Sequence, residues 1–492
     1  NVPIAAQNLS LNPSTATTVL KKLQLYKTIP RTLKKQIERA LKSLKKAKPK
    51  AENCPYRPQY HFLAPALWMN DPNGTIFHDG KYHLFYQHNP YKNKWGSIHW
   101  GHASSEDLIR WKHLPIALAP SQSLGEKHCF SGCCVIDQGV PKVIYTKIGR
   151  IWEVLKGSEQ WMAIGSKDLL KWKKSEYNPI MEDSLHGDES IRQWRDPYIW
   201  KEQGVWYCLL SGHYRWRHRG VVLLYRSHDL INWEYLGPLY EGKKEHGWCY
   251  ECPNFFPLKD KHILVVSPFG KVRYAIGNYE HFRFTPEKWH YLDHGKAFYA
   301  TNTLIDEKQR LILFGWIKGG GQGWNGCISF PRHLSLEGGT LKMRPIPEIE
   351  QLRERKLNLR SSDWKWNETL PINCTNPSQM EIKFGAKMKT SQKDRFGLRL
   401  LNCQKIIEVG YDTAQQKIFI GREGGKINHP QEIMEFHLLL DNSVIEMFVN
   451  DEESIIGHFY PKIKNALQIQ IFSEKERINI KELSVWSLKS IW

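Results

Sequence analysis

The feature that most constrains the fold is a short motif that returns at a fixed interval in the first half of the chain. The motif Ser-x-Asp-Leu-x-x-Trp ends at Trp111, Trp172 and Trp233, which are 61 residues apart, and a looser copy ends at Trp289. Strand units at a fixed period indicate a β-propeller, whose blades close into a ring. Apolar runs bounded by Gly, Pro, Asn and Asp, which are typical of strands, lie between the copies at 81–87, 205–210 and 262–267.

Each repeat predicts one blade, whose first strand faces the axis of the ring. The period is longer than the usual ~40–50 residues per blade, so we expect long loops. The repeated motifs should be turns around a buried Trp, and therefore scaffold. Counting back from each motif to the first strand of its blade gives five roughly equivalent positions, and hence a five-bladed propeller: Asp71, Ser131, Asp196, Glu251 and Asn302.

Three of these five positions are acids that would converge on the axis. Asp71 and Asp196 each precede a proline, and Glu251 begins a Glu-Cys-Pro segment. A single Asp-Pro is more often a turn than a catalyst, but three acids at the blade period favour cleavage of a glycosidic bond by paired carboxyl groups. Clustered acids raise one another's pKa, so one of them can stay protonated near neutral pH. Arg195 is expected to keep its neighbour Asp196 ionised.

Composition excludes several other classes of protein. At 492 residues the chain is long enough for two domains, and it has no apolar run of about 18 residues, so we predict no membrane span. It also lacks a phosphate loop and a dinucleotide fingerprint, and we predict no cofactor. Cys249 and Cys252 have the spacing of a redox or zinc pair. They lack a second pair or a His partner at metal-site spacing, so we predict no metal.

The net charge of +20 is concentrated near the N-terminus. Residues 1–50 hold 12 Lys and Arg and a single acid, Glu38. The rest of the chain is therefore only mildly basic, and we predict no nucleic-acid partner. The arm contains apolar residues at helical spacing, which predicts a basic amphipathic helix that acts as a pro-segment, binds an anionic surface or packs on the body: Leu33, Ile37, Leu41 and Leu44.

Seven segments closely resemble glycoside hydrolase family 32, the invertases and fructan hydrolases. They follow the order of the family: 67–74, 85–90, 95–102, 130–132, 195–197, 251–253 and 314–316. The resemblance is strong over about residues 56–350 and continues more weakly at 410–412 and 441–450. It implies a five-bladed propeller and a retaining β-fructofuranosidase that hydrolyses sucrose and short fructans through a covalent fructosyl-enzyme.

The resemblance also implies residue roles. Asp71 would be the nucleophile, Glu251 the acid/base and Asp196 the stabiliser of the transition state. The residues that match positions lining the fructose-binding subsite are Asn70, Gln87, Trp95, Phe130, Ser131, Arg195 and Trp316. Other functions stay open: an inulinase or levanase, a fructosyltransferase, an inverting five-bladed hydrolase of arabinose or xylose polymers, and a non-catalytic sugar-binding propeller.

We expect an all-β protein in three parts: an N-terminal arm over residues 1–52, the propeller over 53–345, and a linker helix with a β-sandwich over 346–492. Alternating runs at 417–421 and 466–472 favour the sandwich. This last domain should pack away from the acids, as scaffold or as the contact of a homodimer. The protein would be a monomer or a homodimer.

The compartment is predicted from weaker signals. The chain begins at Asn1 without Met and has no apolar signal core, so we expect that a leader was removed and that the protein is secreted. The ten cysteines permit disulfides without being dense. Three surface sites fit the N-glycosylation pattern: Asn8, Asn367 and Asn373.

Overall fold

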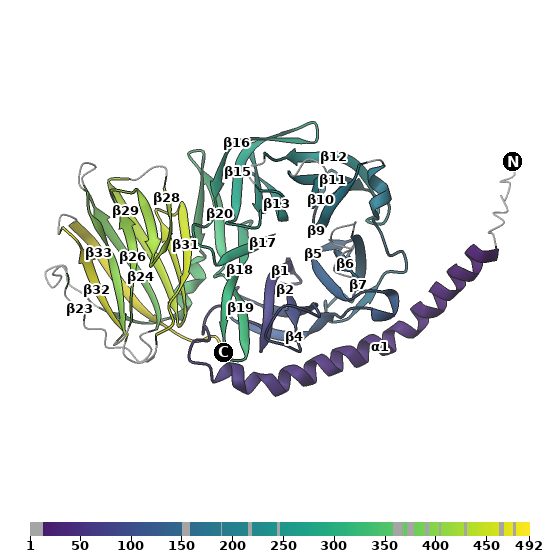
Figure 1. The fold of residues 1–492 in the computed structure, drawn as a ribbon, viewed down its shortest axis with the longest axis horizontal. Coiled ribbons are helices and arrows are strands. Elements are labelled where there is room, and N and C mark those ends of the chain that lie inside the picture. The colour runs from purple at the N-terminus through teal and green to yellow at the C-terminus, as the bar shows by residue number, and fades with distance from the viewer. Residues whose placement is uncertain are drawn as a thin grey trace.

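The computed structural model consists of an N-terminal helix, a propeller and a sandwich, in that order (Figure 1). For residues 13–32 only the helical backbone is described. The described residues are 13–149, 158–187, 189–214, 219–243, 247–357, 367, 369–370, 378–388, 393–402, 405–427, 431–461, 467–475 and 479–492.

Three of the propeller units are separate antiparallel sheets of four strands. The first of them contains β5 (His128–Asp137), β6 (Val140–Ile148), β7 (Glu159–Gly165) and β8 (Trp172–Lys174). The second contains β9 (Ile191–Glu202), β10 (Val205–Tyr214), β11 (Gly220–Ser227) and β12 (Glu234–Glu241). The third contains β13 (Glu251–Leu258), β14 (Lys261–Ser267), β15 (Arg273–Glu280) and β16 (Arg283–Tyr291).

The other two units are fused into one nine-stranded sheet, and this fusion joins the start of the propeller to its end. One unit contains β1 (Leu67–His78), β2 (Lys81–Asn89), β3 (His99–Ser105) and β4 (Trp111–Leu118). The other contains β17 (Phe298–Ile305), β18 (Leu311–Gly321), β20 (Arg332–Glu337) and β21 (Thr340–Pro345). Between them lies β19 (Trp324–Ile328), which pairs antiparallel with β18 and parallel with β1.

The first strands of the five units form a closed ring around the axis. Strand β1 contacts β5, β5 contacts β9, β9 contacts β13, β13 contacts β17, and β17 contacts β1. The sequence predicted these strands as the ones that face the axis. Each carries one of the five equivalent positions, in the order Asp71, Ser131, Asp196, Glu251 and Asn302.

The repeated Asp-Leu-x-x-Trp motifs are turns between the third and fourth strands of three units, as predicted. The leucine of each turn has a left-handed backbone, with φ of 64° at Leu108, 58° at Leu169 and 66° at Leu230. The Trp that ends the motif donates its ring N–H to the carbonyl of that leucine in all three turns. The side chain of the Asp accepts backbone N–H groups, such as those of Ile231 and Asn232. The motifs are therefore scaffold.

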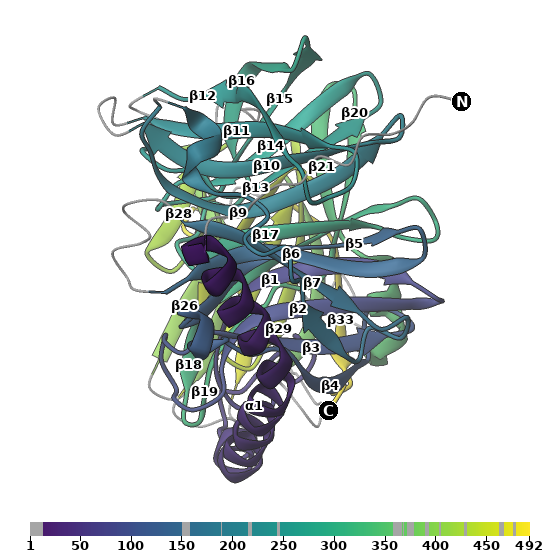
Figure 2. The same ribbon diagram turned by 90° about the vertical axis from the view of Figure 1, so that its right-hand side faces the viewer.

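Helix α1 (Pro13–Glu52) runs along the outside of the propeller (Figures 1 and 2). Ala40, Leu44 and Ala51 are buried in the same apolar cluster as the blades. The predicted helix is confirmed, but Leu41 is not on its packed face, since 40% of its surface is exposed. Helical spacing alone did not show that the smaller Ala40 faces the body. No described helix, α1 included, has an apolar stretch that could cross a membrane.

The C-terminal domain is the predicted sandwich, built of two six-stranded sheets around an apolar interior (Figure 1). It follows a short 3₁₀ helix, η4 (Pro347–Leu352). One sheet contains, in spatial order, β22 (Arg353–Leu357), β33 (Asn479–Leu488), β24 (Gln379–Lys387), β29 (Ile433–Asp441), β30 (Val444–Val449) and β31 (Glu453–His458). The other contains β23 (Thr369–Leu370), β32 (Gln468–Ser473), β25 (Arg395–Asn402), β26 (Lys405–Asp412), β27 (Lys417–Ile420) and β28 (Glu423–Lys426).

Buried charged groups join the sandwich to the propeller. His61 donates or accepts at both ring nitrogens, with Nδ1 2.8 Å from Asp441 and Nε2 2.8 Å from Glu446. Glu446 also accepts from Arg332, at 2.6 Å. All four side chains are fully buried. The relative position of the two domains therefore depends on matched charges as well as on apolar packing.

Only one of the three predicted glycosylation sites lies among the described residues. Asn8 and Asn373 lie outside the described residues, whereas Asn367 is exposed, and its side chain accepts a hydrogen bond from Arg399 at 3.1 Å. The eight described cysteines are buried and form no disulfide. Glycosylation stays a prediction.

Candidate active site

A shift in strand register that recurs in the first strands points the acids toward the axis. In each of the five, the pairing with the second strand shifts after a residue next to or at the predicted position, and β1 and β9 have a second shift. These residues are Met69, Cys129, Arg195, Glu251 and Tyr299. Bulges of this kind re-aim side chains and are frequent beside active sites. A proline lies in three of them, where its missing N–H costs no ladder bond: Pro72, Pro197 and Pro253. The segments that looked like turns in the sequence are thus bulges within strands.

Three non-glycine residues at these bulges have left-handed backbones. The φ angles are 63° at Asp196, 47° at Cys252 and 44° at Ala300. Such conformations are costly for residues with a Cβ and persist where the surrounding structure holds them, which is common at functional sites. The first strands also pack closely around the axis here. The cavity that Ser131, Asp196 and Asn302 help to line has a volume of only about 10 Å³.

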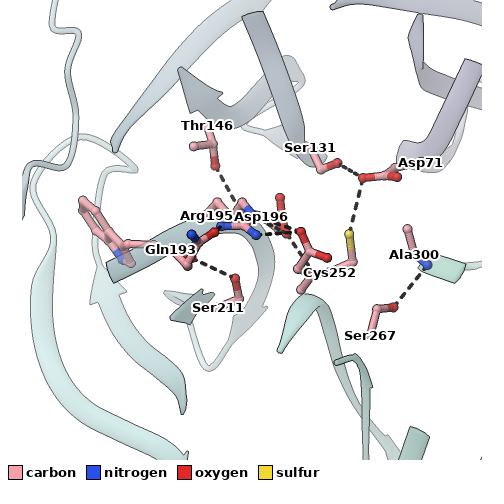
Figure 3. A network of polar contacts seen from close by, with 12 residues as sticks. Asp71, Ser131, Thr146, Gln193, Arg195, Asp196, Ser211, Cys252, Ser267 and Ala300 are labelled. Atoms are coloured by element: carbon pink, nitrogen blue, oxygen red, sulfur yellow. Dashed lines mark hydrogen bonds and ion pairs between the residues drawn. The ribbon is translucent and has the colours of Figure 1, made fainter. Parts of the chain in front are cut away.

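Asp71 is surrounded by hydrogen-bond donors. Its Oδ1 accepts from the Asn70 amide at 3.0 Å, and its Oδ2 accepts from Gln87 at 3.2 Å and from the Ser131 hydroxyl at 2.5 Å. The Cys252 thiol contacts the same oxygen at 3.6 Å (Figure 3). Gln87 also bonds Asn70 and Ser131, so these predicted residues form one network around the carboxyl group.

Glu251 is held by residues from two other blades. Its Oε1 accepts two hydrogen bonds from Arg195, from Nε at 3.1 Å and from the terminal NH2 nitrogen at 2.7 Å. Its Oε2 accepts from the Tyr299 hydroxyl at 2.5 Å. The sequence predicted that Arg195 would pair with Asp196. The guanidinium of Arg195 is 3.8 Å from that carboxyl group and pairs more closely with Glu251.

Asp196 is buried and bonded to backbone. Its Oδ2 accepts the N–H of Cys252 at 3.1 Å, and its own N–H donates to the Thr146 hydroxyl at 3.0 Å (Figure 3). Burial raises the pKa of Asp196 to about 7; Arg195 opposes the rise, and Glu251 and Asp71 add to it. Arg195 thus lowers the pKa of Asp196, as expected, but the cost of burying the charge raises it by more.

The pKa of Asp71 is also raised. Burial is the largest cause, the hydrogen bond from Ser131 opposes it, and the charge of Glu251 adds to it. Three acids and one arginine thus share a site in which the proton affinity of at least two acids is increased. Such a cluster can hold a proton at neutral pH, as the sequence predicted for clustered acids.

Aromatic side chains line the surroundings of the acids. Trp68 donates its ring N–H to Asn70 at 2.9 Å and packs edge-on against Trp316, with ring centroids 5.6 Å apart. Trp95 packs edge-on against Phe130, with centroids 6.1 Å apart. Of the other predicted residues, Trp316 is linked to Asn70 through Trp68, whereas Trp95 and Phe130 contact each other and Phe130 precedes Ser131 in the chain.

Sequence reasoning predicted Arg195 and Glu251 but missed their pairing, and it missed several other residues of the site. Tyr299 contacts Glu251, and Lys318 lies 4.1 Å from the centroid of the Tyr299 ring. Trp248 and Phe269 are 43% and 49% exposed and stack on each other with centroids 4.9 Å apart. No spacing in the sequence signals these contacts, and the one between Glu251 and Tyr299 joins two different blades.

Cys249 and Cys252 form no disulfide. Both are buried and unpaired, and Cys252 instead contacts Asp71 and Asp196. Within the described part of the chain, no group of three or more His, Cys, Asp or Glu side chains could hold a metal ion.

Two family models match the chain. Residues 61–345 match the N-terminal domain of the glycosyl hydrolases family 32, and residues 348–487 match the C-terminal domain of the same family.

Curated and solved relatives agree with these matches. A sucrose-6-phosphate hydrolase of Escherichia coli is 30% identical, over 88% of this chain and 95% of that protein. A β-fructofuranosidase of Arabidopsis thaliana, described as an insoluble isoenzyme, is 29% identical, over 89% of this chain and 90% of that protein. A mutant β-fructofuranosidase of Bombyx mori, solved in complex with sucrose, is 28% identical with a TM-score of 0.78, covering 93% of this chain and 99% of that one.

Proposed function

The chain belongs to glycosyl hydrolase family 32, and we propose that it is a retaining β-fructofuranosidase that releases fructose from sucrose. The observation that carries the proposal is the meeting of three carboxyl groups on the axis, each with its own partners. Asp71 has four donors around it, Glu251 is paired with Arg195, and Asp196 is bonded to the backbone of Cys252.

In the first step, Asp71 attacks the anomeric carbon C2 of the fructosyl unit. The donors on its oxygens favour the ionised, nucleophilic form and fix its direction. As the bond from C2 to the glycosidic oxygen breaks, Glu251 gives that oxygen a proton, and glucose leaves. The product of this step is a fructosyl ester of Asp71.

In the second step, water replaces the enzyme. Glu251, now a carboxylate, takes a proton from a water molecule whose oxygen attacks C2, and the bond between C2 and Asp71 breaks. Two displacements at C2 restore its configuration, so the reaction proceeds with retention. Asp196 would bond the hydroxyl groups of the fructosyl unit, and these bonds strengthen as positive charge develops on the ring.

An exposed aromatic surface that could bind the leaving glucose lies on the side of Glu251. The exposed, stacked pair Trp248 and Phe269 lies beside Arg195, whose guanidinium carbon is 5.9 Å from the Phe269 ring centroid. Aromatic faces of this kind stack on the apolar faces of sugars. The pair supports a pyranose, the ring of the glucose in sucrose, as the group that leaves.

The test is release of glucose and fructose from sucrose by wild type, Asp71→Asn and Glu251→Gln. Each substitution keeps the shape of the side chain and removes one chemical role, so we expect kcat to fall by at least about three orders of magnitude. Asp79→Asn is the matched control, because Asp79 is exposed in the turn after β1. It should keep wild-type activity.

The same assay separates the rival functions. Sucrose 6-phosphate, inulin and levan are offered alongside sucrose, and a preference for one of them would replace sucrose within the same family. Accumulation of longer fructosides instead of free fructose would identify a fructosyltransferase. A wild type that binds these sugars and cleaves none would be a sugar-binding propeller, and the proposal would be wrong.

A further inference from the structure

The two oxygens of Glu251 are not equivalent. Oε1 accepts two N–H groups of Arg195, at 3.1 and 2.7 Å, and these use both of its in-plane lone pairs. Oε2 accepts only one hydrogen bond among the described residues, from the Tyr299 hydroxyl at 2.5 Å. A proton carried by Glu251 must therefore be on Oε2, directly beside the Tyr299 hydroxyl.

The Tyr299 hydroxyl has one hydrogen and two acceptors within reach. Besides Oε2 of Glu251, the carbonyl oxygen of Ser267 lies 2.9 Å away. The backbone N–H of Phe269 donates to the hydroxyl oxygen at 3.0 Å. A hydroxyl group donates once, so its hydrogen can point at Glu251 or at Ser267, but not at both.

We propose that the Tyr299 hydroxyl is a two-position switch that follows the protonation of Glu251. When Glu251 is ionised, the hydrogen points to Oε2; when Oε2 is protonated, it points to the carbonyl of Ser267. Tyr299 is thus a positioning residue for the acid/base. The inference rests on the role given to Glu251 under the proposed function.

The switch fits both steps of the reaction with all protons accounted for. In the first step, the proton on Oε2 moves to the glycosidic oxygen as the bond to C2 breaks, and the Tyr299 hydrogen turns from Ser267 to the carboxylate left behind. In the second step, Oε2 takes a proton from the attacking water, and the hydrogen turns back. Tyr299 itself neither gains nor loses a proton.

The side chain of Tyr299 is held in place, so the switch requires only a rotation of its hydroxyl hydrogen. The residue is 7% exposed, Lys318 lies 4.1 Å from its ring centroid, and the N–H of Phe269 fixes its oxygen. Burial, and then the nearby charge of Glu251, raise the pKa of Tyr299 far above its ordinary value, so it stays protonated throughout.

Other charged or titratable groups face Glu251 from the surrounding strands. They come from β1, from β9, from the segment before and the start of β13, and from β18: Asp71, Arg195, Asp196, Cys249, Cys252 and Lys318. None of these six groups bonds Oε2, so replacing Tyr299 removes the direct partner that this oxygen has in the described part of the chain.

The test is the pH dependence of kcat/KM for sucrose in Tyr299→Phe, which removes only the hydroxyl. Loss of a charge-assisted hydrogen bond disfavours the ionised Glu251, so the alkaline limb should move up by about one to two pH units. The acid limb, set by the nucleophile, should stay in place. At the plateau kcat/KM should fall roughly tenfold or more. Tyr235→Phe is the control: its hydroxyl also bonds a carboxylate, Glu189 at 2.9 Å, but on the outer strand β12.

A second measurement does not depend on activity. With ¹³C-labelled glutamate, the side-chain carboxyl resonance that disappears in Glu251→Gln is followed against pH in wild type and in Tyr299→Phe. Its titration midpoint should move to higher pH in Tyr299→Phe and stay in place in Tyr235→Phe. An unchanged midpoint, or an unchanged alkaline limb, would overturn the switch and leave Tyr299 with a packing role only. Failure of wild type to cleave sucrose would contradict the proposed function instead, and the titration would still decide the switch.

Discussion

At the scale of single residues, the site combines groups that are costly for the fold. Asp196 is buried, has a left-handed backbone, and has its pKa raised to about 7. Its ionised form therefore destabilises the native state relative to an unfolded chain, in which the pKa is near 3.9. The free energy of unfolding falls as pH rises from about 4 to about 7. In this range the unfolded chain has lost the proton of Asp196, whereas the native state still holds it.

Asp196→Asn should therefore stabilise the protein while it removes activity. We expect a gain on the order of 1–2 kcal/mol at pH 8, and little difference near pH 4, because the native Asp196 is protonated there. Thermal melts of both proteins at the two pH values check this. A variant less stable than wild type at pH 8 would show that the ionised carboxylate contributes to folding.

Trp248 gives a second prediction at this scale. If its exposed ring stacks on the leaving glucose, Trp248→Ala should lower kcat/KM for sucrose by roughly tenfold, mainly through a higher KM. Hydrolysis of methyl β-fructofuranoside, which has no sugar to stack, should change little. Equal losses on both substrates would mean that Trp248 supports the shape of the site and not the glucose.

The sequence predicted that Asp71, Asp196 and Glu251 lie near one another, and in the structure their charges interact. It did not predict that Arg195 pairs with Glu251 or that the Tyr299 hydroxyl donates a hydrogen bond to Glu251. Both contacts cross from one blade to another, over 56 and 48 residues. Local patterns carry no information on such contacts, since a side chain between two acids can turn to either.

At the scale of elements, the first three blades each contain a signature turn and a bulge. The turn has a sequence signature, because an Asp must accept backbone N–H groups and a Trp must bond the leucine carbonyl. The bulge has only a proline as its signal, which is why Asp71 and Asp196 looked like turn residues. The period of the strands was therefore predictable, and the exact element that carries each acid was not.

Removal of one turn should cost stability without touching the site. In Asp229→Ala, the N–H groups of Ile231 and Asn232 lose their acceptor, and the free energy of unfolding should fall by about 1–2 kcal/mol. His228→Ala, at an exposed position in the same turn, is the control. Denaturant unfolding measures the difference, and kcat on sucrose should stay at the wild-type value in both variants.

At the scale of the whole molecule, the sandwich is tied to the propeller through a buried histidine. Asp441 accepts N–H groups from three consecutive residues, 59–61, and also bonds the His61 ring. Burial opposes a charge on His61, but its bonds to Asp441 and Glu446 outweigh burial and raise its pKa to about 9. The sequence resemblance around Asp441 thus marks the junction of the domains. Secretion and a monomeric or homodimeric state stay predictions.

The junction should weaken in alkali. Because the native pKa of His61 lies above the unfolded value near 6.5, the stabilisation is fully present below pH 6.5 and is lost as pH rises through about 9. His61→Gln leaves two buried carboxylates poorly matched and should cost about 3–5 kcal/mol at pH 6, and less at pH 9.5. Melts of wild type, His61→Gln and the exposed-site control His228→Gln test this. A cost that does not change with pH would contradict a charged His61.

The measurement that tests the central claim most directly is hydrolysis of sucrose in aqueous methanol, followed by ¹H NMR. A covalent fructosyl-enzyme on Asp71 that is attacked from the same face should give glucose, fructose and methyl β-fructofuranoside, and Asp71→Asn should give none of them. Formation of the α-anomer would show inversion and remove Asp71 as nucleophile. No cleavage of sucrose would contradict the account as a whole.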